Sequence, residues 1–185
     1  AVRAGAWHLT ESPFSPEDLS LQLDVFIAAK REAERYRDAA FLDPFTGLYT
    51  PPGIQHRAVE LAALASRAHE PLACVVFSPA TAARARDAVL DAIARALRDL
   101  GRRSDAIGSL GDGQYAVVAP STPAQGATLL AERFAGGVEE DLRTHLRAGF
   151  DVATTVDKPV LVAPQLIDHA RRAVAESAAG NGKQW

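Results

Sequence analysis

The sequence lacks the patterns typical of disulfide-bonded, membrane-spanning, metal-binding and nucleic-acid-binding proteins. It has one cysteine, Cys74, so no intrachain disulfide can form, and its apolar surroundings predict a small buried hydrophobe. No run approaches the roughly 20 apolar residues of a membrane span, and no secretory signal pattern is present, so we expect a cytoplasmic location and no membrane partner. The five histidines share no metal-ligand spacing, and a net charge of −3 argues against nucleic acid as a partner.

Length and composition fit one globular domain with a short attached segment. The 185 residues are 48% apolar and 23% charged, values typical of a soluble domain. Residues 1–14, with a predicted strand at Val2–Thr10, are interpreted as the remnant of an upstream domain or linker. Residues 15–42 are predicted to form a stalk helix, because Ser15 is a good N-cap and Pro16 suits the first helical position. Its three-four apolar spacing indicates a dimerising stalk, with packing onto its own domain as the alternative.

Residues 43–181 predict alternating helices and strands. Helical periodicity predicts helices at residues 53–68, 82–100, 123–135 and 164–178. Apolar and β-branched runs predict strands at residues 72–77, 106–110, 115–119, 146–155 and 160–162. Asp112-Gly113 between two short strands indicates a tight hairpin turn, and Thr122 with Gln125 has the spacing of a capping box. The fold class expected from this order is α/β, with a mixed central sheet flanked by helices.

Three segments in this region occur in a distinctive order. They are Asp43-Pro44-Phe45-Thr46-Gly47-Leu48-Tyr49, then Arg102-Arg103-Ser104-Asp105 five residues before Gly111-Asp112-Gly113-Gln114-Tyr115, then Ala131-Glu132-Arg133-Phe134. Together they resemble the GGDEF family, the bacterial diguanylate cyclase domains that condense two GTP molecules into cyclic di-GMP. The resemblance covers about Asp43 to Asn181 and implies a nucleotidyl cyclase-like fold, preceded by the end of a GAF-type sensory domain.

Position by position, the resemblance implies that catalysis is lost. Where the family has an aspartate that binds catalytic magnesium, this chain has Ser78, and where its hairpin has a second metal carboxylate, this chain has Gly113. Gln114 replaces the glutamate that follows. Magnesium prefers carboxylate oxygens and phosphates, so we expect no metal site, no catalytic residue and no magnesium requirement. Ser109 replaces an arginine of the family, so Asp43 is expected to cap its own turn.

The inhibitory site of the family is retained in this sequence. In many members, Arg-x-x-Asp before the hairpin binds cyclic di-GMP, assisted by an arginine on the following helix, and the matching residues are Arg102, Asp105 and Arg133. An arginine fork can donate to guanine O6 and N7, and a carboxylate can accept from its N1 and N2 hydrogens. The segments Arg35–Asp38 and Arg84–Asp87 also have the pattern Arg-x-x-Asp. The match to the inhibitory site therefore depends on the five-residue distance between Asp105 and the hairpin.

The sequence therefore predicts a non-catalytic cyclic di-GMP receptor that forms a homodimer through residues 15–42 and acts on a downstream protein it does not name. One alternative is a pseudoenzyme used only for dimerisation or partner docking, in which Arg133 is an ordinary surface arginine. Another is a weak diguanylate cyclase whose metal is held by Asp112 or Asp87, although Asp87 is expected to face solvent from its helix.

Overall fold

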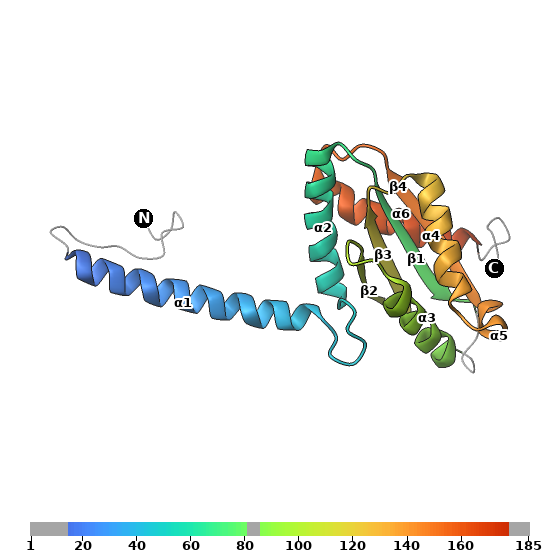
Figure 1. Ribbon diagram of the computed structural model, residues 1–185, viewed down its shortest axis with the longest axis horizontal. Helices are drawn as coiled ribbons and strands as arrows, with labels where there is room; N and C mark the ends of the chain where they lie inside the picture. Colours follow the sequence, from blue (N-terminus) through green and yellow to red (C-terminus); the bar gives the residue numbers. More distant parts are fainter. Residues whose placement is uncertain (1–14, 81–85, 178–185) are drawn as a thin grey trace. The chain divides into compact units, whose positions relative to one another are not determined.

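The computed structural model of the chain describes residues 15–80 and 86–177 (Figure 1). The Cα packing divides the chain into residues 1–39 and 40–185, so helix α1 (Pro16–Phe41) is described by itself. The expected helix start is confirmed: Pro16 is the first helical residue, and the Asp18 amide donates to Ser15 Oγ at 3.5 Å. The strand predicted at residues 2–10 lies outside the described residues.

The domain after α1 is built on a four-stranded sheet. Its elements in chain order are α2 (Pro51–Ala68), β1 (Leu72–Pro79), α3 (Arg86–Leu100), β2 (Ala106–Gly111), β3 (Gln114–Pro120), α4 (Ala124–Gly136), α5 (Glu140–Arg143), β4 (Leu146–Ala153) and α6 (Pro159–Glu176). The strand order is β2-β3-β1-β4, and all three pairings are antiparallel. The expected α/β fold is confirmed. Within the described ranges, no helix has the length and apolar character needed to cross a bilayer.

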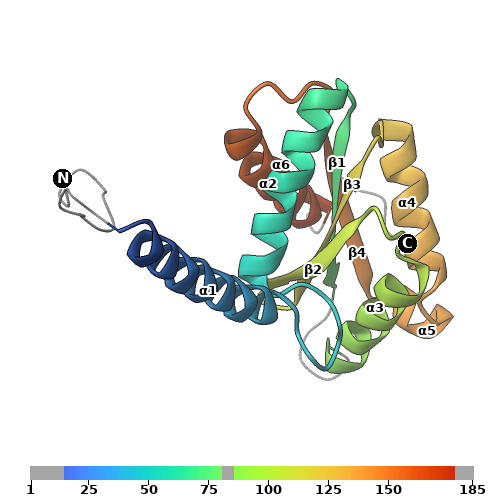
Figure 2. The same ribbon diagram turned by 60° about the vertical axis from the view of Figure 1, so that its left-hand side comes forward.

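Helices cover both faces of the sheet. In Figure 2, α2 and α6 lie on one side of the strands and α3 and α4 on the other. Along β1, Ala73, Val75 and Phe77 pack into the α3/α4 core, whereas the alternate residues Cys74 and Val76 pack into the α2/α6 core. A strand buried on both faces has a continuous apolar run, which is why β1 was readable as a central strand.

The hairpin between β2 and β3 also forms as expected. Asp112 and Gly113 have φ values of 53° and 74°, the left-handed conformation that a tight two-residue turn requires. The turn brings Gln114, the first residue of β3, opposite Gly111. The hairpin that resembles the family's catalytic segment is therefore present as a structural element.

The strand expected at residues 160–162 is wrong, because α6 already begins at Pro159. The amides of Leu161 and Val162 both donate to the Lys158 carbonyl, at 2.9 Å. Proline at the first helical position favours this start, and it overrides the β-propensity of the Val-Leu-Val run. Pro164, expected to open the helix, lies inside it, where proline removes one intrahelical hydrogen bond.

The capping box expected at the start of α4 is also wrong. The N-cap residue is Pro123, which makes no side-chain capping bond, and α4 begins one residue later at Ala124. The hydroxyl of Thr122 instead donates to the Pro120 carbonyl at 2.9 Å, so it stabilises the preceding turn. The helix start expected at residue 82 and the helix end expected at residue 178 both lie outside the described residues.

Candidate functional site

The turn between α3 and β2 holds a buried carboxylate. The Asp105 side chain is 2% exposed. Its Oδ2 accepts from the Arg102 amide at 3.3 Å, its Oδ1 accepts from the Ser104 hydroxyl at 3.2 Å, and its own amide donates to the Arg102 carbonyl at 3.0 Å. These bonds close the four-residue turn and fix the carboxylate beside the first residue of β2.

Arg133 approaches the same carboxylate from the last turn of α4. Its Nη2 is 3.9 Å from Asp105 Oδ2, close enough for an ion pair and too far for a hydrogen bond. The Nε and Nη2 atoms are buried and have no hydrogen-bond partner. The guanidinium carbon lies 4.9 Å from the centroid of the buried Phe134 ring, which supports the head group. Arg133 therefore keeps donors that a ligand could satisfy, and unpaired buried donors are costly.

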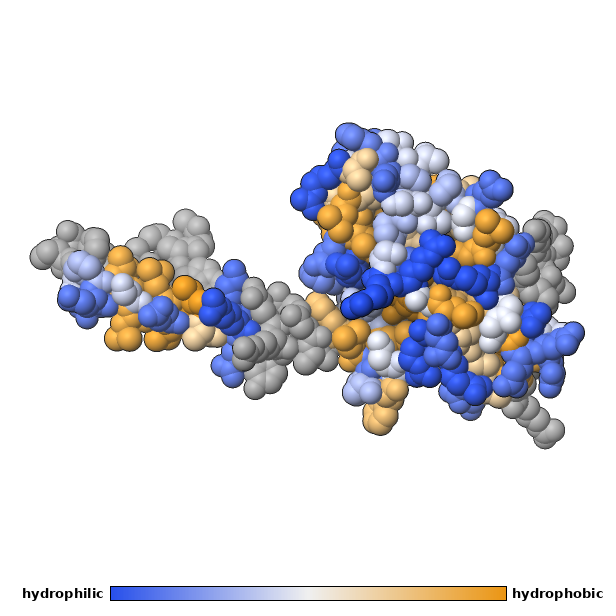
Figure 3. All heavy atoms as spheres, viewed as in Figure 1, coloured by the Kyte–Doolittle hydropathy of each residue, from blue (hydrophilic) through white to orange (hydrophobic). Residues whose placement is uncertain are grey.

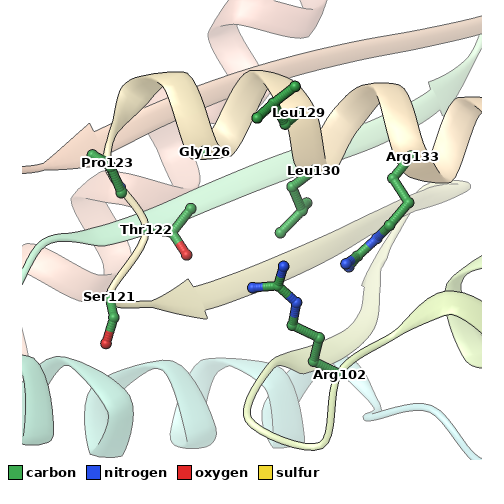
Figure 4. Close-up of a pocket in the computed structure, with 8 residues that line it drawn as sticks. All are labelled: Arg102, Ser121, Thr122, Pro123, Gly126, Leu129, Leu130 and Arg133. Atoms are coloured by element: carbon green, nitrogen blue, oxygen red, sulfur yellow. The ribbon is translucent and has the colours of Figure 1, made fainter.

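Arg102 and Arg133 line one pocket of about 230 Å³. In Figure 4 their guanidinium groups converge on the same space, Arg102 from the turn and Arg133 from the helix. No hydrogen bond or ion pair to the Arg102 guanidinium occurs within residues 15–80 and 86–177. The three residues expected to form the site are thus brought together, with two cationic groups beside one carboxylate, an arrangement suited to an anionic ligand.

Sequence reasoning missed the remaining walls of this pocket. They come from the turn before α4 and from α4 itself, and are Ser121, Thr122, Pro123, Gly126, Leu129 and Leu130. Nothing in their local pattern marks them, because ordinary turn and helix residues become pocket walls only when β3 and α4 are placed beside the Arg102 turn. The Thr122 hydroxyl adds a polar group to these walls, whereas the Ser121 hydroxyl donates to the Glu70 carboxylate and points away from the two arginines (Figure 4).

The positions that the sequence resemblance matched to metal ligands lie elsewhere, at the end of β1 and on the hairpin. Arg86 donates from its Nη2 to the Asp112 carbonyl at 2.6 Å, and a Cβ on Gly113 would lie 2.6 Å from the same nitrogen. Arg171 Nε donates to Gln114 Oε1 at 2.8 Å. In the part of the chain that the structure describes, no three His, Cys, Asp or Glu residues are grouped as metal ligands. Asp87 is exposed on α3, as expected.

Asp43 caps its own turn, as expected. Its Oδ1 accepts from the Thr46 amide at 2.7 Å, from the Thr46 hydroxyl at 3.0 Å and from the Phe45 amide at 3.0 Å. These bonds, those of Thr46 foremost, hold the pKa of Asp43 below its ordinary value. The Asp43 carboxylate therefore stabilises the turn that it begins.

Comparisons with solved structures define the class of fold. A diguanylate cyclase, SiaD of Pseudomonas aeruginosa in complex with its activator SiaC, is 18% identical with a TM-score of 0.63, over 89% of this chain and 72% of that one. The GGDEF domain of DgcB from Caulobacter crescentus, in complex with c-di-GMP, is 13% identical with a TM-score of 0.60, over 78% and 94%. The FimX GGDEF domain from P. aeruginosa is 17% identical with a TM-score of 0.61, over 78% and 97%.

These similarities establish a GGDEF-like fold at low sequence identity. No protein-family profile and no curated protein sequence matches the chain.

Proposed function

We propose that the chain is a non-catalytic GGDEF-like module that binds cyclic di-GMP through Arg102, Asp105 and Arg133. The observation that supports this most strongly is the convergence of Arg102 and Arg133 on one pocket, beside a carboxylate that is oriented by the turn holding Arg102. Cyclic di-GMP combines two phosphates with two guanines, so it can use both the cationic groups and the carboxylate.

Each residue has a role that its contacts permit. The Arg102 guanidinium donates to guanine O6 and N7, and Arg133 meets a phosphate with its Nε and Nη2, which have no hydrogen-bond partner. An ionised carboxylate has about four acceptor sites, and the turn uses two of those on Asp105. Because the Asp105 side chain is 2% exposed, its other acceptor sites reach the N1 and N2 hydrogens of guanine only when Arg133 moves away from it. The complexes of DgcB with c-di-GMP show that a GGDEF fold can bind this ligand.

The loss of catalysis is proposed from the hairpin and the end of β1. Ser78 and Gly113 offer no carboxylate at the two positions where the resemblance implies magnesium ligands, and Gln114 replaces the glutamate that follows. The guanidinium groups of Arg86 and Arg171 contact the same hairpin, and their positive charge disfavours a divalent cation there. Metal-dependent condensation of GTP is therefore not expected.

Calorimetric titration of the 185-residue chain with cyclic di-GMP in EDTA tests this function. Arg102→Ala should remove a charge-assisted contact and cost at least ~1.5 kcal/mol, about tenfold in affinity. Arg103→Ala is the matched control, because Arg103 is exposed in the same turn but does not line the pocket. Absence of binding at tens of micromolar protein would reject the receptor and favour a docking pseudoenzyme. Turnover of GTP with magnesium, abolished by Asp112→Ala, would favour a weak cyclase.

We also propose that α1 pairs with α1 of a second copy. Four of its apolar side chains, exposed by 45–66%, are Leu21, Leu23, Val25 and Ile27. Figure 3 shows apolar residues gathered on the described part of this helix, a surface that self-association would bury. In sedimentation velocity, Leu23→Glu should shift the chain towards monomer, and Ala28→Glu, at an exposed position on the other side of the helix, should not. Equal behaviour of the two variants would reject this pairing.

A further inference from the structure

Strand β4 forms one edge of the sheet. In the order β2-β3-β1-β4, it pairs only with β1 within residues 15–80 and 86–177. The central strand β1 is buried from Leu72 to Phe77, whereas β4 is half-buried or exposed along most of its length. An edge strand keeps a row of backbone N–H and C=O groups that can pair with another strand. The described part of the chain therefore leaves the outer side of β4 without a partner strand.

A hollow of about 280 Å³ follows the same edge, lined by Phe150 and Asp151 of β4 and by α6 residues that include Arg172 and Glu176. Phe150 lies opposite Val75 and shares its face, towards α3 and α4, whereas the next residue, Asp151, points to the α6 face. A hollow lined by residues of both faces passes around the outer side of the strand. Phe150 is 38% exposed there, so an apolar ring borders the unpaired edge.

Arg147 and Asp151 share the α6 face of β4, because they are four residues apart on one strand. Arg147 has a buried Nε without a hydrogen-bond partner, and no carboxylate pairs with it in the two described ranges. Asp151 Oδ2 lies 2.8 Å from His169 Nδ1, which holds the carboxylate in place. Roughly 13 Å of strand separates Arg147 from Asp151, so they cannot pair within one chain.

We propose that β4 pairs antiparallel with β4 of a second copy, about a two-fold axis at Gly149, with α6 of both copies on the same side of the joined sheet. In this register Arg147 lies opposite the partner's Asp151, so one ion pair forms on each side of the axis. Because opposite residues must share a face, the register can move only in steps of two residues. A shift by two removes both ion pairs, and a shift by four sets like charges opposite one another.

The apolar residues of the other face match in the same register. Ala148 lies opposite the partner's Phe150, and Leu146 lies opposite the partner's Val152. Pairing therefore covers the exposed Phe150 ring as well as the backbone edge. The edge carries charges of both signs, which a second copy matches and a uniformly acidic or basic strand does not.

Sedimentation equilibrium of the 185-residue chain tests this interface in a Leu23→Glu background, in which α1 is not expected to pair. We expect dimers that dissociate on dilution. Arg147→Glu sets two carboxylates opposite one another on each side of the axis, so it should weaken association at least about tenfold. Arg103→Glu is the matched control, because it makes the same charge change at an exposed residue beside β2, the opposite edge of the sheet. Its association should stay within about twofold of the background.

Exchanging the two charges identifies the register. Asp151→Arg should weaken association as Arg147→Glu does, and the double variant should recover most of it, because opposite charges again face each other across the axis. A monomer at hundreds of micromolar, an equal loss in Arg103→Glu, or a double variant no stronger than Arg147→Glu would each overturn the proposal. If Arg147→Glu fails to fold, Phe150→Lys decides the question, since Phe150 belongs to neither core and its loss should also weaken association. Failure of cyclic di-GMP binding or of α1 pairing leaves these expectations unchanged.

Discussion

Gly149→Ala tests the packing that places Arg171 over the sheet. A Cβ at this position of β4 would clash with the Val174 nitrogen, and it would lie 2.7 Å from the Ala173 carbonyl carbon and 2.9 Å from the Ala170 oxygen. All three are backbone atoms of α6, so no flexible side chain can move aside. Because such contacts are normally near 3.5 Å, the helix must shift by about 1 Å. Overpacking of this kind costs about 1–3 kcal/mol.

Thermal unfolding followed by far-ultraviolet circular dichroism measures this cost. For a domain of this size, the melting temperature should fall by roughly 3–10 °C. Gly136→Ala is the control, because Gly136 ends α4 and a Cβ there meets nothing within 4 Å. That variant should gain about 0.4–1 kcal/mol through reduced freedom of the unfolded chain. A Gly149→Ala variant as stable as the unmodified chain would refute the close packing of α6 on β4.

Two further expectations concern titratable groups. The hydrogen bonds from Thr46 keep the pKa of Asp43 below its ordinary value of 3.8. Ionised Asp43 therefore stabilises the folded state above pH 3.8, and this stabilisation is lost as the pH falls through the lowered pKa. Asp43→Asn should therefore melt at a lower temperature at pH 7, by a difference that shrinks below pH 4; a constant difference would contradict this. Burial, with Asp151 as a smaller cause, raises the pKa of Cys74, so a thiol reagent should modify it only on unfolding, and immediate native modification would contradict it.

Local signals predicted much of the fold because local chemistry decides those elements. The apolar run of β1, the Asp112-Gly113 turn and the cap formed by Asp43 each depend on neighbours in sequence. The error at residues 160–162 arose where two local signals compete: the Val-Leu-Val run favours a strand, and Pro159 favours a helix start. Residues 160–162 belong to α6, which packs across the sheet. The residues that α6 contacts are far away in the sequence, so a short window of sequence does not reveal this packing.

The candidate site was predictable only in part, for the same reason. Arg102 and Asp105 belong to one turn, so their spacing places them together, whereas the distance of Arg133 from Asp105 depends on how α4 packs. The contacts of Arg86 and Arg171 with the hairpin join residues 26 and 57 positions apart. No motif marks such pairs, and only the fold brings them together.

The binding of cyclic di-GMP can be observed directly at the arginine side chains. In a nitrogen-15 correlation spectrum of the 185-residue chain, each arginine Nε–H group can give its own signal. On titration with cyclic di-GMP in EDTA, the signals of Arg102 and Arg133 should shift and saturate together, because the ligand satisfies the buried Nε donor of Arg133. The signal of Arg147, on the opposite face of the sheet, should stay in place. Unchanged Arg102 and Arg133 signals at saturating ligand would contradict the proposed receptor.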